Sequence, residues 1–424
     1  MYFSDQQQVI GTANDFPRVA PRLRTSLVSG NVLLLGLTSM FTDISSEMVT
    51  AALPIYLTFE LRLTALQFGL FDGLYQGMSV LLRLVGGLFA DRHRRYKEVA
   101  TVGYAVSAGC KLGLLIAQSA WLPTTACLFL DRLGKGIRTA PRDSLISLSS
   151  SRTRRAEAFG AHRALDTAGA LLGPLVAFTL LGLFPGAFSI IFVVSFGMGL
   201  LGLAILVLFV ENQQPDTHMD STSINRSWRS VLSPLGMTSF RRLFLAATLL
   251  SLLSISDAFI YLTFQRLSNL NISYFPLLYL GTALIYLTLA IPLGRLADRV
   301  GRQRVFLGGY VGLLAVYMVL LLPQLGMLAL LACLMLFGTY YAATEGVLVA
   351  LASALLPAAQ LTSGLALLTT ATILSRLVAS ILYGALWSWQ GPHMALSVFI
   401  IGLAITMTCT AFTLLGRQPE PELE

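Results

Sequence analysis

The sequence predicts an all-α membrane protein with about twelve transmembrane helices in two six-helix bundles. Charged residues make up only 12% of the 424 residues, about half the share that is typical of soluble domains. The mean hydropathy is +0.73. The chain also divides into apolar runs of about 20 residues, which is the length that a helix needs to cross the hydrocarbon core. These observations favour a chain that is solvated by lipid.

Apolar segments fall into two groups of six, separated by the longest hydrophilic interval. In the first half they lie near residues 29–60, 67–90, 98–117, 123–147, 158–181 and 187–210. In the second half they lie near 242–265, 274–297, 304–322, 327–350, 362–387 and 393–415. The interval 211–241 is rich in Ser, Thr, Pro and Asn, so we expect a linker between bundles 29–210 and 242–415. Residues 1–28 and 416–424 are the expected tails.

The basic residues form short clusters that predict the orientation of the chain. Although the net charge is +8, Lys and Arg are not gathered in one stripe, so nucleic-acid binding is not predicted. The clusters lie near 92–97, 152–155, 226–242 and 299–304, in alternate loops, whereas the opposite loops carry almost no charge. The positive-inside rule therefore predicts that both tails and the linker are cytoplasmic.

An internal repeat relates the two halves. "IYLTFE" at 55–60 recurs 205 residues later as "IYLTFQ" at 260–265, and "GLFADRHRR" at 87–95 recurs 207 residues later as "GRLADRVGR" at 294–302. Two matches at nearly one spacing indicate parallel structural repeats, an arrangement known among secondary transporters.

The repeated loop resembles the hallmark of the major facilitator superfamily of secondary transporters. The family pattern G-x-x-x-D-R-x-G-R-R is matched by two sets of residues. They are Gly87, Asp91, Arg92, Arg94 and Arg95 in the first half, and Gly294, Asp298, Arg299, Gly301, Arg302 and Arg304 in the second. In the family this loop is a conformational latch at the cytoplasmic ends of the helices. The first copy departs mildly, since His93 stands where Gly is common.

Two further patterns resemble signatures of proton-linked exporters in this family. On the fourth span Arg132 and Gly136 match R-x-x-Q-G-x-G, while Lys135 and Arg138 replace its Gln and second Gly. On the fifth span Gly169, Gly173 and Pro174 match the Gly-x-x-x-Gly-Pro core of antiporters, where small residues let helices approach and Pro bends the helix.

The resemblance implies a proton-coupled transporter of a small organic solute that works by alternating access. We expect export by antiport, in a monomer in the cytoplasmic (inner) membrane of a prokaryote. One alternative is a proton symporter or exchanger that imports an anionic metabolite or a metal chelate, since the fourth span is basic. Another is a non-transporting membrane sensor on the same fold.

Charged residues within the spans are candidate functional groups, because each costs roughly 2.5–3.5 kcal/mol on insertion scales. Asp43 and Glu47 are four residues apart and share one helix face. On the fourth span Arg132, Lys135 and Arg138 also share a face. In the family, helices 1, 4, 7 and 10 line the cavity, so we hypothesise a network of Asp43 and Glu47 with Arg132 and Arg138. These groups either exchange protons or form fixed ion pairs.

The second half supplies further candidates. Asp257 follows Ser256 on the seventh span and is either a second proton site or a structural Asp bonded to hydroxyls. Glu345 lies four residues after Tyr341 on the tenth span, and aromatic rings with a carboxylate suit an organic ligand. The other candidates for the substrate cavity are Tyr340, Arg376 and Ser256.

Some residues are as well explained by structure as by function. His162 and Asp166, at i and i+4 on the fifth span, are either a proton relay or hydrogen-bonded structure. The four cysteines lie in apolar segments without ligand spacing, so we expect buried thiols, no metal site and no cofactor. The sequence holds no HExxH, GxSxG or P-loop pattern, so an enzyme is not predicted.

Overall fold

The computed structural model describes residues 29–77, 95–117, 120–151, 154–212, 233–357 and 360–415, and every regular element within them is helical. The first half contains α1 (Gly30–Ile55), the π-helix η1 (Tyr56–Glu60), a helix over 65–77, α3 (Tyr96–Ala117), α4 (Trp121–Leu148), α5 (Arg155–Leu183) and α6 (Phe188–Leu208). The second half contains η3 (Ser233–Gly236), α8 (Thr238–Leu252), α9 (Asp257–Leu267), η4 (Ile272–Tyr274), α10 (Phe275–Val300), α11 (Arg302–Val319), α12 (Met327–Leu355), α13 (Leu361–Gln390) and α14 (Pro392–Leu415). The predicted all-α class is confirmed.

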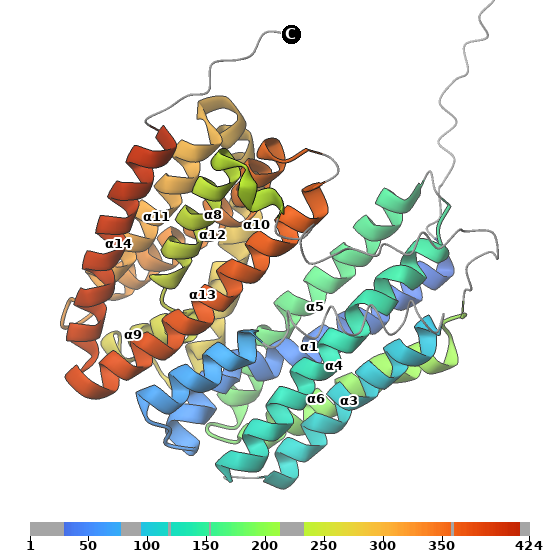
Figure 1. Cartoon of the computed structure of the whole chain (residues 1–424). Coiled ribbons are helices and arrows are strands. Elements are labelled where there is room, and N and C mark those ends of the chain that lie inside the picture. The colour runs from blue at the N-terminus through green and yellow to red at the C-terminus, as the bar shows by residue number, and fades with distance from the viewer. Residues whose placement is uncertain are drawn as a thin grey trace, which may run out of the picture.

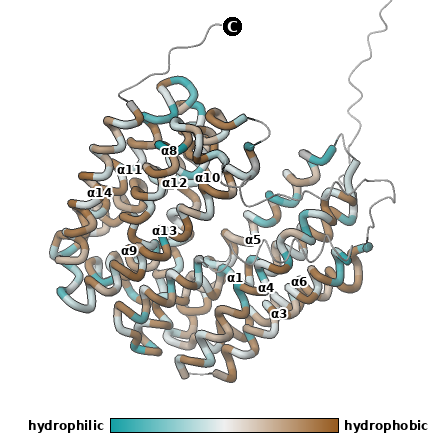
Figure 2. The backbone as a smooth tube through the Cα atoms, viewed as in Figure 1, coloured by the Kyte–Doolittle hydropathy of each residue, from teal (hydrophilic) through white to brown (hydrophobic). Residues whose placement is uncertain are grey.

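Nine helical segments within the described ranges are long and apolar enough to cross a membrane. The helix α4 is not among them, because Asp131, Arg132, Lys135 and Arg138 follow one another closely in its sequence. Figure 2 shows the hydrophobic residues spread along the outer helices, such as α14 and α3, as expected for surfaces that face lipid.

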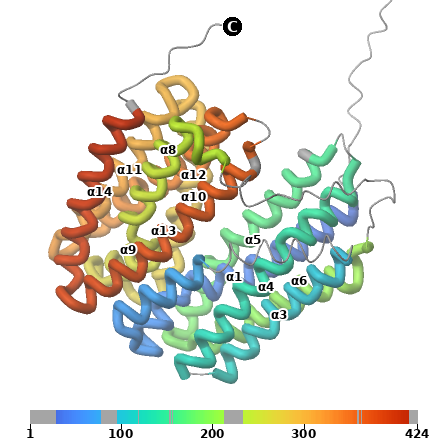
Figure 3. The backbone as a smooth tube through the Cα atoms, viewed as in Figure 1, coloured from blue at the N-terminus to red at the C-terminus, as the bar shows by residue number. Residues whose placement is uncertain are grey.

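The helices gather into two groups that follow the two halves of the chain (Figures 1 and 3). In the first half α1 packs against α5 and α6, and α3 packs against α4. In the second half α12 packs against α10 and α11, and α13 packs against α8 and α14. Each half is therefore a bundle with contacts of its own.

Glycines bring α1 and α5 into close contact. A Cβ atom on Gly169 would lie 2.5 Å from the carbonyl oxygen of Met40, and one on Gly173 would lie 2.8 Å from Cβ of Glu47. Neither position has room for a side chain, so the two backbones approach as closely as small residues permit. The helix α5 continues past Pro174 to Leu183, and α4 continues past Pro141 to Leu148.

The seventh span is broken, which the sequence did not predict. Instead of one helix near 242–265, α8 ends at Leu252 and α9 begins at Asp257. Backbone groups freed by such a break need partners inside a membrane protein. Here the N–H of Ile255 donates to the hydroxyl of Tyr317 at 2.6 Å. A side chain from α11 therefore supplies a hydrogen-bond partner for a backbone group at the break. The break places Asp257 in the first turn of a new helix.

The two bundles meet at one end, which we call the closed end. It comprises the helix over 65–77 with the nearby ends of α5, α9, α10 and α13. The N–H of Leu66 donates to Ser388 Oγ at 2.8 Å, and Ser273 Oγ donates to the carbonyl oxygen of Leu181 at 2.8 Å. Toward the opposite ends, where α1 begins and α14 finishes, the bundles diverge in Figure 1.

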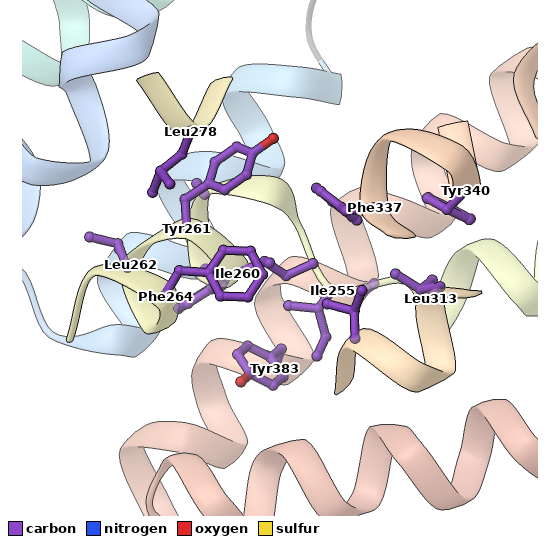
Figure 4. Packing of buried hydrophobic residues seen from close by; sticks show 14 of the residues in the cluster. Ile255, Ile260, Tyr261, Leu262, Phe264, Leu278, Leu313, Phe337, Tyr340 and Tyr383 are labelled. Atoms are coloured by element: carbon purple, nitrogen blue, oxygen red, sulfur yellow. The ribbon is translucent and has the colours of Figure 1, made fainter. Parts of the chain in front are cut away.

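Aromatic residues fill the core around α9 (Figure 4). The ring of Tyr261 lies 4.4 Å from that of Tyr279 and 5.8 Å from that of Phe337, measured between centroids. This packing joins α9 to α10 and α12. The expectation of four buried cysteines holds for Cys110 and Cys333. It is wrong for Cys409, which is exposed on α14, and Cys127 is only partly buried.

Candidate functional site

Arg138 connects α4 to α1 inside the first bundle. Its Nη2 atom lies 3.8 Å from Oδ1 of Asp43, and its guanidinium carbon lies 4.6 Å from the centre of the Tyr104 ring. Only 3% of the Arg138 surface is exposed. A cation held between a carboxylate and an aromatic face is stabilised by both.

Lys135 lies one turn earlier on α4 and pairs with Glu47. The Nζ atom is 3.6 Å from Oε1 of Glu47, and the two side chains are 30% and 29% exposed. This pair is therefore more accessible than the one formed by Asp43 and Arg138. An ion pair that water reaches is weaker than a buried one and more easily exchanged for a bound solute.

Arg132 does not join the network that we hypothesised. Its Nη2 atom donates to the hydroxyls of Tyr75 and, at 3.1 Å, Thr50, and its guanidinium carbon lies 4.0 Å from the Tyr75 ring centre. Asp43 and Glu47 thus meet Arg138 and Lys135, because the helical rotation of α4 directs Arg132 toward the helix over 65–77. Its partner Tyr75 could not be identified from spacing within one helix.

Asp166 on α5 completes the site around Asp43. The two carboxyl groups adjoin each other, and Nη1 of Arg142 lies 3.6 Å from Oδ1 of Asp166. The Ser39 hydroxyl accepts from Arg142 at 3.1 Å and lies 3.0 Å from Nε2 of His162. The i, i+4 spacing singled out Asp166 only as a partner of His162, but the fold gives it Asp43 and Arg142 as neighbours.

A second buried pair, Lys111 with Asp131, joins α3 to α4. The ammonium group donates directly to the carboxylate, and the two residues are 1% and 4% exposed. Both groups are neutralised by each other deep within the bundle, so we assign this pair a structural role.

In the second bundle Asp257 accepts a hydrogen bond from the hydroxyl of Tyr341. Arg376 on α13 extends toward the same tyrosine, with its guanidinium carbon 6.0 Å from the ring centre. Ser256 is the N-cap residue of α9, but its side chain makes no capping hydrogen bond. The structure therefore brings Asp257, Tyr341 and Arg376 together from three helices.

Contrary to the prediction that Tyr340 lines the substrate cavity, this residue lies in the aromatic core of the second bundle. It is 2% exposed, and its ring packs at 6.0 Å from Phe337 and 5.3 Å from Tyr310, measured between centroids. Adjacent residues on a helix point about 100° apart, so Tyr340 enters the core while Tyr341 meets Asp257. Glu345 is exposed, and Tyr286 of α10 lies close to it.

Asp72 is a charged residue that the sequence analysis missed. It is 8% exposed and lies on the helix over 65–77, where its carboxylate accepts from Ser380 Oγ of α13 at 2.9 Å and from Gln76 Nε2 at 3.0 Å. The sequence did contain a signal for this residue, since Asp72 lies within the glycine-rich stretch "FGLFDGLYQG". Glycines at that spacing indicate close contact with another helix, so a carboxyl group among them is predicted to be buried in that contact.

The predicted latch is described only in its second copy, since Gly87, Asp91 and Arg92 lie outside the described residues. Oδ1 of Asp298 accepts from Arg302 Nε at 2.9 Å, and Arg302 donates to the carbonyl oxygen of Ala350 at 3.0 Å, which ties α10 and α11 to α12. Arg299 is exposed. A Cβ atom on Gly294 would meet nothing within 4 Å, so this glycine does not mark a close contact between helices.

Two bundles of apolar helices with charged groups buried between the helices define a membrane transport protein rather than an enzyme. The model of the Major Facilitator Superfamily matches residues 35–282 and 264–424. The chain therefore belongs to the Major Facilitator Superfamily, and it is a secondary transporter of that type.

Known proteins agree with this assignment. An uncharacterized MFS-type transporter of Methanocaldococcus jannaschii is 31% identical over 367 residues, which cover 85% of this chain and 89% of that protein. A crystal structure of the nucleoside transporter NupG matches with a TM-score of 0.73 at 14% identity. The match covers 91% of this chain and 99% of the NupG chain. An inward-facing, unoccupied bacterial homolog of the human lysosomal transporter Spinster has a TM-score of 0.70 at 16% identity, with coverage of 92% and 98%.

Proposed function

We propose that this protein is a proton-coupled transporter that moves a small organic solute by alternating access and exports it by antiport. The observation that carries the proposal is the position of Asp43 between the cation Arg138 and a second carboxyl group, that of Asp166. In this proposal one proton is exchanged at the pair, since a proton on either carboxyl group removes the repulsion between two like charges. Binding or release of that proton changes the net charge of the site by one unit.

The accessible pair of Lys135 and Glu47 supplies the link from proton to solute. It lies on the same faces of α4 and α1 as Arg138 and Asp43, one helical turn away. A solute that displaces Lys135 from Glu47 changes the electrostatic field at Asp43, because charges a few ångströms apart interact strongly in a medium of low dielectric constant. Solute binding and proton release then compete, as antiport requires.

Export agrees with the arrangement of the bundles and the expected topology, and the partial matches to exporter signatures on the fourth and fifth spans favour it. The bundles diverge toward the ends where α1 begins and α14 finishes (Figure 1). We expect these ends to be cytoplasmic, and an exporter loads its solute from the cytoplasm. We further propose that the protein works as a monomer in the cytoplasmic (inner) membrane of a prokaryote. The basic loop clusters support this topology.

Import of an anionic metabolite or metal chelate by symport or exchange is the second candidate. Arg376 favours it, since its guanidinium group lies over the Tyr341 ring and offers a planar, bidentate site for a carboxylate. A non-transporting sensor on the same fold is the third reading.

The test uses the full chain in proteoliposomes that contain a pH-sensitive dye, screened with cationic drugs, sugars and organic anions. Proton movement opposite to the solute supports antiport, and movement with an organic anion supports the symport alternative. Solute flux that leaves the internal pH unchanged would overturn proton coupling. An absence of flux for every class would favour the sensor.

A further inference from the structure

The closed end contains a buried carboxyl group, that of Asp72, which forms a hydrogen bond between the two bundles. Asp72 lies on the helix over 65–77, and its Oδ2 atom accepts a hydrogen bond of 2.9 Å from Ser380 Oγ on α13 of the other bundle. The contact can exist only while the two bundles meet at this end, so Asp72 is well placed to respond to opening and closing.

The backbones around Asp72 are in close contact. A Cβ atom on Gly69 would lie 2.4 Å from the carbonyl oxygen of Ser380, one on Gly73 would lie 2.7 Å from that of Leu377, and one on Gly384 would lie 2.4 Å from that of Ala65. These glycines flank Asp72 along the same contact between the helices. Closure at this end therefore removes water from the carboxyl group, which is 8% exposed.

The groups that face Asp72 are polar or acidic. They are Gln76 on its own helix, Ser380 on α13, Ser256 and Asp257 at the start of α9, and Tyr279 on α10. Among these described neighbours none is a cation. Burial of an ionised carboxylate without a cation is costly, whereas a protonated carboxyl group keeps its hydrogen bonds and carries no charge.

We propose that Asp72 is a second proton-exchanging carboxyl group, which takes up a proton when the closed end forms and loses it when that end opens. The proton comes from water that reaches Asp72 in the open state. Asp257 is the neighbouring carboxylate that can accept it on the cavity side. This inference rests on the proton-coupled function proposed above, and it assigns to the helix over 65–77 the step that links protonation to closure.

The experiment measures closure directly, without solute. Nitroxide spin labels are attached to Cys at positions 66 and 389 (Leu66→Cys and Trp389→Cys) of the full chain, in which the four native cysteines are replaced by Ser. Both side chains are exposed, and they lie beside the Leu66–Ser388 contact. Dipolar broadening of the spectrum reports the closed end, and it is followed as the pH rises.

We expect broadening to decline as the pH rises, with the ratio of closed to open molecules falling by at most about tenfold per pH unit for one proton. Asp72→Asn should keep the broadening at all pH values. Glu98→Gln is the control, since this carboxyl group is exposed near the start of α3, at the opposite ends of the helices, and this variant should behave like the native chain. Ser380→Ala should deepen the loss at high pH, because the ionised form loses a donor when buried.

A native-like pH dependence in Asp72→Asn would overturn the inference, as would broadening that does not change with pH in the otherwise native chain. If Asp72→Asn does not fold, the Ser380→Ala variant provides the test. A pH dependence of broadening equal to that of the native residue in Ser380→Ala would then contradict proton exchange at Asp72. The measurement is independent of the function proposed above. A transport assay without proton movement would remove the coupling and leave the spectral result standing.

Discussion

The Nη2 atom of Arg138 lies 3.8 Å from the Oδ1 atom of Asp43, and this contact joins α4 to α1 in the interior of the first bundle. The same guanidinium group lies over the Tyr104 ring of α3. Arg138 thus holds three helices around a carboxyl group that has a second carboxyl group, Asp166, on its other side. A change in the charge of Asp43 therefore acts on the contact between Arg138 and Asp43 that holds α4 against α1.

The stacking of Arg138 on Tyr104 should be measurable as a coupling energy. We expect Arg138→Gln and Tyr104→Leu to be less than additive, with a coupling of about 0.5–2 kcal/mol, because each alone removes the cation–π contact. The measurement is the free energy of unfolding in mixed micelles for the two single variants and the double variant. Strict additivity would show that the stacking does not contribute.

The buried pair of Lys111 and Asp131 predicts a different pattern. Lys111→Met alone should lower the free energy of unfolding by about 3–5 kcal/mol, because it leaves an unpaired buried carboxylate. The double variant Lys111→Met with Asp131→Leu should recover most of this loss. Thermal unfolding in detergent checks both. A double variant less stable than Lys111→Met would contradict a purely structural pair.

Adjacent tyrosines on α12 provide a matched comparison for Asp257. Tyr341→Phe removes the hydroxyl that donates to Asp257, so ionisation of that carboxyl group becomes less favourable and the pH of half-maximal flux should rise. Tyr340→Phe should leave it unchanged, since that hydroxyl lies 3.5 Å from Ser254 and away from Asp257. Flux measured against pH distinguishes the two. Equal shifts would remove Asp257 from the proton pathway.

Two glycines of α5 should respond in opposite directions. Gly169→Ala forces a methyl group against the Met40 carbonyl oxygen and should cost about 1–3 kcal/mol of stability. Gly160→Ala enters open space and should be neutral or stabilising by up to about 1 kcal/mol, since Ala favours the helix. Melting temperatures of the purified variants test this. Equal melting temperatures would show that α1 and α5 are not closely packed.

Much of the fold could be predicted because lipid imposes simple rules on composition and length. The apolar runs predicted helices close to the observed bounds, for example 123–147 for Trp121–Leu148. The break between α8 and α9 could not be predicted, because its backbone is satisfied by Tyr317, which is 62 residues away from Ile255 in the chain. Ser254 and Ser256 gave only a polar interruption in an apolar run.

The candidate site was harder to predict than the fold. Shared helix faces correctly indicated that Asp43 and Glu47 approach the basic face of α4, yet which cation meets which carboxylate depends on the rotation of α4. For this reason Arg132 was assigned a carboxylate partner and instead meets Tyr75. The role of Asp72 could not be predicted from neighbouring residues, because its partner Ser380 is in the other bundle, 308 positions later in the chain.

In the proposed mechanism the Asp43 carboxyl group couples proton movement to solute movement. The most direct measurement compares the native protein with Asp43→Asn in proteoliposomes, in two assays with the same solute. Asp43→Asn should lose accumulation driven by a pH gradient and keep solute exchange at equal pH, because binding and alternation survive while proton exchange does not. Gradient-driven accumulation at the native rate in Asp43→Asn would contradict the claim.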